Sequence, residues 1–221
     1  MIDIARHLSA VHREVSAEPD TETVRVLLRR SYDAEIDDVW TAITDPERVR
    51  RWFLPLTGDL RVGGTFNLEG NAGGDILECE PPRLLRVTFG GPTSIVELRL
   101  APDKSDKSDE SDDSGTSTVL ELDHSVPLAM AGSAAGALYV GPGWDGAVMG
   151  LGLFLAGEPI EDPVAMANSL EVQEFSLESL RLWAAIARES NSATEEEIAA
   201  ATEVSQQQFA PDLLTAKDSA G

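Results

Sequence analysis

The chain is poor in the residue types that build the commonest catalytic and metal sites. Among its 221 residues, Cys79 is the single cysteine, which excludes an internal disulfide and a thiolate metal cluster. The three histidines are scattered along the chain, and no serine lies in a nucleophile-elbow pattern. We therefore expect neither a metal nor another cofactor. The absence of paired cysteines favours a cytoplasmic location.

Long hydrophobic runs are scarce as well. The stretch from Ser125 to Gly157 carries a single charge, at Asp145, but Pro127, Pro142 and eight glycines interrupt it. A membrane-spanning helix needs about 20 predominantly apolar residues in a row. We therefore interpret this stretch as a loop followed by a buried helix, and we expect no membrane partner.

Basic charge is the third deficit. The chain has 17 Lys and Arg residues against 39 Asp and Glu residues, and its formal net charge is −22. Nucleic-acid backbones and anionic membrane surfaces both repel such a chain. The charge balance therefore excludes nucleic acid as an expected partner and is typical of a solubilising surface.

Hydrophobic periodicity divides the chain into three segments. Residues 1–21 are predicted to hold an N-terminal helix, residues 22–157 the main domain, and residues 158–221 a C-terminal helical extension. The N-terminal helix is predicted because four apolar residues recur at helical spacing, namely Ile4, Leu8, Val11 and Val15.

The C-terminal extension is predicted to contain amphipathic helices. An apolar stripe over residues 172–187 either packs on the main domain or pairs with a second copy as a homodimer. The run from Thr194 to Glu197 predicts a capping box at the start of a later helix. The tail after Pro211 is expected to fray.

The main domain begins with a strand and two short helices. Residues 23–32 alternate as a strand does, and Asp45 and Pro46 suit the start of the second helix. Glycine pairs then break the sequence into a predicted antiparallel meander. Its expected strands are residues 59–62, 65–69, 75–80, 84–89, 94–100 and 117–124.

Two loops are expected in the main domain. Residues 103–114 contain acids, lysines and serines but no apolar residue, which predicts a disordered acidic loop. This loop lacks the glycine and the terminal glutamate of a calcium-binding loop. Residues 125–138 are expected to form a flexible loop that leads into an apolar helix over 143–157.

Several motifs of the main domain resemble those of a known superfamily. They are Val39-Trp40, Thr44–Val49, Arg51–Phe53, Gly58–Phe66, Glu80–Leu84, Leu122–His124 and Gly141–Asp145. Residues 22–157 are similar in this way to the SRPBCC/START-like superfamily, and within it to the activator of heat-shock protein 90 ATPase homologue group. The resemblance implies an α+β helix-grip fold, in which a curved antiparallel sheet wraps a long helix and leaves a cavity. The superfamily includes lipid carriers, polyketide binders, aromatase/cyclases and many uncharacterised bacterial members.

One motif imitates a dinucleotide-binding fingerprint. Residues 141–146 have the pattern G-x-G-x-x-G at the start of a helix, and Glu161 follows 20 residues after Gly141. The preceding strands are predicted to be hairpins, however, and Pro142 removes an amide that a phosphate would need. We therefore interpret the motif as a tight loop that leads into the long helix.

The cavity implied by the resemblance is expected to have an apolar lining. Such a lining suits a hydrophobic small molecule, held by buried area and a few orienting polar groups. The residues predicted to bind this ligand are Trp40, Trp52, Phe53, Phe66, Phe89, Leu98, Leu120, Leu122, His124, Trp144 and Val148.

His124 and Asp145 are the two candidates for catalysis. Strand parity directs His124 towards the cavity or its rim, and Asp145 lies in the first turn of the long helix. Paired in an apolar pocket, the two side chains would act as acid and base. Each also has an ordinary structural interpretation, because the helix dipole stabilises a carboxylate at a helix start.

Three functions remain open at this point. The first is a binding protein for a small hydrophobic ligand. The second is a cavity enzyme of the cyclase or hydrolase type that uses His124 and Asp145. The third is a stress-related or co-chaperone-like interaction protein that acts through its helical extension. The poor catalytic inventory favours binding over catalysis.

Overall fold

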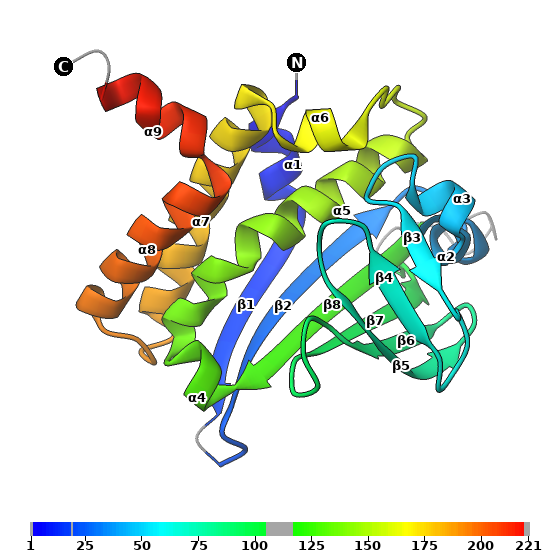
Figure 1. Ribbon diagram of the computed structural model, residues 1–221, viewed down its shortest axis with the longest axis horizontal. Helices are drawn as coiled ribbons and strands as arrows, with labels where there is room; N and C mark the ends of the chain where they lie inside the picture. The colour runs from blue at the N-terminus through cyan, green and yellow to red at the C-terminus, as the bar shows by residue number, and fades with distance from the viewer. Residues whose placement is uncertain (1, 19, 105–116, 219–221) are drawn as a thin grey trace. The chain divides into compact units, whose positions relative to one another are not determined.

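The computed structural model describes residues 2–18, 20–104 and 117–218 (Figure 1). Of the acidic loop that the sequence predicts to be disordered, residues 105–114 lie outside the described residues. The remaining chain combines one antiparallel sheet with helices, which confirms the predicted α+β helix-grip class.

The described residues contain eight strands. In chain order they are β1 (Val11–Glu18), β2 (Thr23–Tyr32), β3 (Leu56–Gly58), β4 (Thr65–Leu68), β5 (Gly73–Glu80), β6 (Leu84–Thr88), β7 (Ile95–Pro102) and β8 (Thr118–Pro127). Their order in the sheet is β1-β2-β8-β7-β6-β5-β4-β3. From β3 to β7 each strand pairs with the next along the chain, as the predicted meander requires.

Helices precede, interrupt and follow the strands. They are α1 (Ile4–Ser9), α2 (Ile36–Thr44), α3 (Pro46–Val49), α4 (Leu128–Ala131), the 3-10 helix η1 (Ala134–Tyr139), α5 (Gly141–Leu155), α6 (Pro163–Ala167), α7 (Leu170–Glu189), α8 (Glu195–Phe209) and α9 (Pro211–Asp218). The predicted capping box is confirmed at α8. The Thr194 hydroxyl accepts from the Glu197 amide at 3.2 Å, and the Glu197 carboxylate accepts from the Thr194 amide at 2.7 Å.

The chain divides into two compact units. The first consists of residues 1–28, 124–149 and 164–221, and the second of residues 29–123 and 150–163. Neither unit coincides with one of the three segments inferred from periodicity. The division at residues 21 and 157 therefore stays a prediction.

In the first unit, α7 is the central helix. It contacts β1, η1, α8 and α9, and η1 also contacts β1 and α8. Figure 1 shows α7 and α8 side by side. The apolar stripe predicted over residues 172–187 is largely buried within this unit, since Phe175 is 1% exposed and Trp183 is 0% exposed. Leu182 stays exposed, and the homodimer stays a prediction.

In the second unit, α3 begins where the sequence predicts. The Asp45 carboxylate accepts a hydrogen bond from the Glu47 amide at 2.9 Å, and Pro46 occupies the first helical position of α3. Residues 150–155 of α5 also belong to this unit. A side chain at Gly152 would meet the Arg30 guanidinium, because an added Cβ would lie 2.6 Å from it.

The prediction of a single helix over residues 1–19 is wrong. Only Ile4–Ser9 is helical, and Val11–Glu18 is strand β1. Val11 and Val15 are four residues apart, a spacing that fits one face of a helix and equally one face of a strand. Both are buried, whereas His12 and Glu14 are exposed and form an ion pair at 2.6 Å on the alternate positions.

Three further expectations on local structure are wrong. Residues 59–62 form a turn, and the strand lies earlier, at Leu56–Gly58. Residues 125–138 are ordered as the end of β8, as α4 and as most of η1, because Leu138 and several η1 alanines are buried. Residues 211–218 of the tail form α9, and the Asp212 amide near its start donates to the Gln173 side chain at 3.0 Å.

Candidate functional site

The sheet of the second unit has one face that is apolar throughout its central strands. Residues opposite each other in paired strands share a face, as do alternate residues along one strand. By these two rules a single face carries Phe66, Leu68, Ile76, Cys79, Leu85, Val87, Phe89, Val96, Leu98 and Leu100. We call this set the apolar face.

The opposite face of the same strands is charged. Glu97 lies between Arg86 and Arg99, at 3.8 Å from the first guanidinium and 2.7 Å from the second. Glu97 and Arg99 alternate with Val96 and Leu98 along β7, and Arg86 of β6 pairs with Glu97. The charged side chains of these strands therefore lie on the face opposite the apolar face, together with Leu84 and Ile95.

Burial along the apolar face is uneven. Ile76, Val87 and Val96 form a buried row, each less than 9% exposed. The neighbouring row of Cys79, Leu85 and Leu98 is only half-buried. Partial burial raises the pKa of the Cys79 thiol, because an apolar environment disfavours the thiolate.

An aromatic pair lies on the apolar face beyond these rows. The rings of Phe66 and Phe89 are stacked, with centroids 6.3 Å apart and planes inclined by 28°. Both side chains are half-buried. Phe66, Phe89 and Leu98 are among the residues predicted to line a ligand cavity, and all three lie on one face of one unit.

Four other predicted lining residues of the second unit, Trp40, Trp52, Leu120 and Leu122, are buried, whereas Phe53 is half-buried. Trp52 stacks on Phe53 with ring centroids 5.3 Å apart, and its Nε1 donates to the carbonyl of Ala42 at 2.9 Å. Trp40 and Trp52 are each 8% exposed. Leu120 and Leu122 of β8 are 4% and 3% exposed. These buried side chains have the environment of core residues.

Three predicted lining residues belong to the first unit. Trp144 Nε1 donates to His124 Nδ1 at 3.0 Å, and the two rings are perpendicular with centroids 5.7 Å apart. The accepting nitrogen therefore carries no proton in this arrangement. Val148 is buried. The structure thus brings His124 and Trp144 together, as a hydrogen-bonded pair.

Asp145 is fully buried and held by three other residues of the first unit. Its carboxylate accepts from Arg13 Nε at 2.9 and 3.0 Å, from Ser179 Oγ at 2.5 Å and from Trp183 Nε1 at 3.0 Å. We call Arg13, Asp145, Ser179 and Trp183 the Asp145 cluster. The proposed acid–base pairing of Asp145 with His124 stays a prediction, and these contacts describe a structural ion pair.

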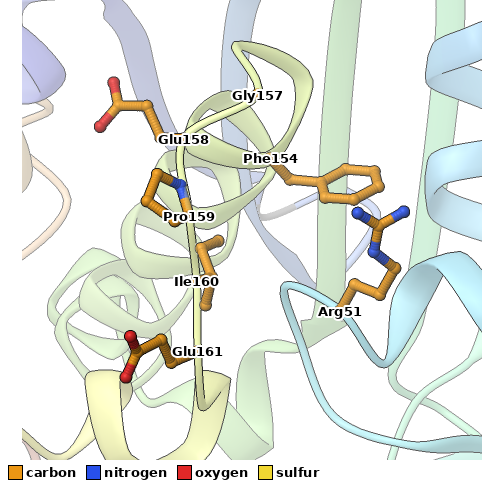
Figure 2. A pocket seen from close by; sticks show the side chains of 7 residues that line it. All are labelled: Arg51, Phe154, Gly157, Glu158, Pro159, Ile160 and Glu161. Carbon is orange, nitrogen blue, oxygen red and sulfur yellow. The ribbon is translucent and has the colours of Figure 1, made fainter.

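A separate pocket lies in the second unit beside the end of α5. Arg51, Phe154 and residues 157–161 line it, and its volume is about 230 Å³ (Figure 2). The Arg51 guanidinium lies over the Phe154 ring, 5.0 Å from its centroid. Figure 2 shows the carboxylates of Glu158 and Glu161 directed away from Arg51.

Sequence reasoning missed this pocket and part of the apolar face. Arg51 lies in a motif of which only Trp52 and Phe53 were predicted to bind ligand. Cys79 lies beyond the register shift between Ile76 and Glu78, so simple alternation along β5 does not place it on the apolar face. The alternating pattern of β6 is the signal that would have identified Leu85.

Two other kinds of site are absent from the described ranges. No helix there combines the length and the apolar character that crossing a membrane requires. No three His, Cys, Asp or Glu side chains of the same ranges gather as a metal site would need.

Comparison with solved structures gives two close matches and a distant one. The crystal structure of CalU16 from Micromonospora echinospora is 39% identical, with a TM-score of 0.62, and the match covers 80% of this chain and 98% of that one. The solution structure of CalU16 is 38% identical over 82% and 97% of the two chains, with a TM-score of 0.64. The conserved protein EF2215 from Enterococcus faecalis, of unknown function, shares the fold at 13% identity over 83% and 95% of the chains, with a TM-score of 0.57.

The family comparison agrees with the resemblance noted in the sequence. None of the curated proteins matches this chain. The sequence profile described as "Activator of Hsp90 ATPase homolog 1-like protein" matches residues 33–132. Together with the CalU16 match, which extends over nearly all of that protein, this shows that the chain belongs to the family of activator of Hsp90 ATPase homolog 1-like proteins.

Proposed function

We propose that this protein binds a small hydrophobic molecule on the apolar face of its second unit. The observation that carries the proposal is the half-burial of Phe66, Phe89 and Leu98 on a face without a charged side chain. Side chains of this kind in a closed core are shielded from water almost completely. Contiguous apolar surface that stays accessible is typical of a binding site.

The energetic argument for binding rests on the unfinished burial of these side chains. Full burial of a Leu or Phe side chain stabilises by about 1.5–3 kcal/mol. Covering the exposed half of a half-buried side chain with a ligand therefore contributes roughly 1 kcal/mol to the free energy of binding. Phe66, Cys79, Leu85, Phe89 and Leu98 are all half-buried. A ligand that covers several of them gains enough to offset part of the entropy lost on binding.

The chemistry of the face limits the ligand class. Its ten members are apolar side chains and one cysteine, whereas charged residues of these strands occupy the opposite face. A charged group placed on the apolar face would lose its hydration without gaining a partner. The proposed ligand is therefore an uncharged, apolar molecule.

Catalysis through His124 and Asp145 finds no such support. Asp145 is 0% exposed, and its carboxylate is already occupied by the guanidinium of Arg13, a hydroxyl and an indole. A general base must reach the proton that it removes within hydrogen-bond distance. Binding is therefore the function that we propose.

We further propose a cytoplasmic protein without a nucleic-acid partner. The single cysteine supports the location, because disulfides mark oxidising compartments. The net charge of −22 supports the second point, because phosphate backbones repel it.

A titration with nile red, a neutral hydrophobic dye, tests the proposed function. We expect saturable binding to the full chain, seen as a rise in dye fluorescence. Leu98→Ser should weaken it about fivefold, which corresponds to the loss of roughly 1 kcal/mol of apolar contact. The matched control is Leu77→Ser, since Leu77 is 43% exposed and is not part of the apolar face.

Thermal melts of both variants establish that they are folded. If the two substitutions weaken nile red binding equally, or if binding never saturates, the apolar face is not the site and the proposal is wrong.

A further inference from the structure

The pocket beside α5 contains a cation that the chain itself leaves unpaired. Arg51 is an exposed residue. Within the described ranges, its guanidinium has no hydrogen bond or ion pair, and it lies over the Phe154 ring. Many arginines of this acidic chain do pair with a carboxylate. They include Arg13, Arg29, Arg48, Arg50, Arg61, Arg86, Arg99, Arg181 and Arg188.

The unpaired state of Arg51 is notable because two carboxylates line the same pocket. Glu158 and Glu161 both contribute to its wall, and neither makes an ion pair with Arg51. Figure 2 shows their side chains directed away from the guanidinium. The positive charge is therefore available to a ligand that enters the pocket.

The Phe154 ring orients this charge. Arg51 lies 5.0 Å from the ring centroid and Arg48 lies 5.2 Å from it, so two cations contact one aromatic ring. Arg48 is neutralised by Asp38, at 2.7 Å. Arg51 keeps its full charge, held in place by an aromatic contact that leaves the donors of the guanidinium free.

The other lining residues of the pocket and its volume limit the kind of ligand that it can hold. Phe154 provides apolar surface beside the guanidinium, and Pro159 and Ile160 also line the pocket. A volume of about 230 Å³ corresponds to about eight water molecules, which is below the range of drug-sized pockets. The pocket fits a molecule with one ring or a short branched chain.

We propose that this pocket binds a small organic monocarboxylate. The guanidinium of Arg51 holds the carboxylate through two parallel N–H donors, and the apolar body of the ligand packs on Phe154 and Ile160. Glu158 and Glu161 repel anions of higher charge, so a monoanion is selected. This site is separate from the apolar face and does not depend on the function proposed above.

Benzoate is the probe that tests the proposal, with uncharged benzamide as its isosteric control. Nitrogen–proton correlation spectra of the full chain report the amides of Gly157 and Ile160. We expect benzoate to shift them saturably in the millimolar range. Arg51→Gln should weaken binding about tenfold, as the loss of a charge-assisted hydrogen bond does.

Arg50→Gln is the matched control. Arg50 is the preceding residue, is exposed and pairs with Glu47, so its loss removes the same charge from the same helix end without touching the pocket. We expect this variant to bind benzoate as the wild type does. Nile red binding, which should be unchanged in both variants, reports that they are folded.

Three results would overturn the proposal. Shifts of the same amides by benzamide, with an affinity equal to that of benzoate, would show that charge is not recognised. Equal losses in the Arg50 and Arg51 variants would show a general charge effect. Displacement of nile red by benzoate would show that the two ligands share one site. A failure of nile red to bind, with benzoate binding intact, would refute only the function proposed for the apolar face.

Discussion

The substitution Asp145→Asn tests the assignment of Asp145 to a structural role. It keeps the shape of the side chain and removes its charge. In the folded protein, Asp145 is fully buried, and the Arg13 side chain is 5% exposed. The variant therefore leaves a buried guanidinium without its counter-charge.

The magnitude follows from what Arg13 retains. Its Nη1 still donates to the carbonyls of Leu8 and Val11, both at 2.9 Å, so part of the hydrogen bonding survives. Removing one partner of a buried ion pair costs about 3–5 kcal/mol. For a chain of this size, that loss lowers Tm by about 6–20 °C.

Urea and thermal unfolding followed by circular dichroism measure the effect. We expect Asp145→Asn and Arg13→Met each to be strongly destabilised. The double variant Arg13→Met/Asp145→Leu should recover much of the loss, because replacing both charges by apolar groups avoids the unpaired charge. High salt should leave these differences nearly unchanged, since a buried pair is poorly screened.

Two outcomes would refute the reasoning. One is an Asp145→Asn variant whose unfolding free energy lies within about 1 kcal/mol of the wild type, far below the cost of an unpaired buried charge. The other is a double variant no more stable than either single variant, which would show that the two side chains do not act as a pair.

Three further predictions concern other parts of the chain. Gly141→Ala should destabilise the first unit by about 1–3 kcal/mol and change its tryptophan fluorescence, because the added Cβ would lie 2.4 Å from Trp183 Nε1; an unchanged melt would contradict this. Burial raises the pKa of the Cys79 thiol, so at pH 8 this thiol should react with iodoacetamide more slowly than the thiol of glutathione does. The contribution of the protonated Cys79 thiol to the free energy of unfolding should fall as the pH rises through that raised pKa. Thr194→Ala should speed amide exchange in the first turn of α8 and return the Glu197 pKa, which hydrogen bonds from Thr194 lower, towards its ordinary value. The ionised Glu197 side chain stabilises the folded state above the ordinary glutamate pKa, and this stabilisation is lost as the pH falls through the lowered pKa of Glu197. Thermal melts at a series of pH values would check this.

The fold class could be predicted from the sequence because the patterns that indicate it lie within short segments of the chain. Gly63-Gly64 and Gly90-Gly91 lie between successive strands of the meander, although Gly73-Gly74 lies inside β5, and Asp45 with Pro46 marks the start of α3. The error at β1 also has a local cause, since a spacing of four between Val11 and Val15 suits a helix and a strand alike. What decides between them is pairing in the sheet, which periodicity alone does not contain.

The candidate site could be predicted from the sequence only in part, because the contacts that define it join residues far apart in the chain. Phe66, Phe89 and Leu98 were predicted as lining residues, and the strand register of the structure places them on one face. The partner of Asp145, by contrast, is Arg13, which is 132 residues away, and no local rule connects the two. The helix dipole explained a carboxylate at that position without requiring a partner.

The central claim is that the apolar face binds a hydrophobic molecule, and intermolecular nuclear Overhauser effects test it most directly. The complex of the full chain with nile red is observed through its methyl groups. The account predicts cross-peaks from the dye to the methyls of Leu85 and Leu98, which are half-buried on that face. Cross-peaks confined to exposed side chains such as Leu182 and Val204, or none at all, would contradict it.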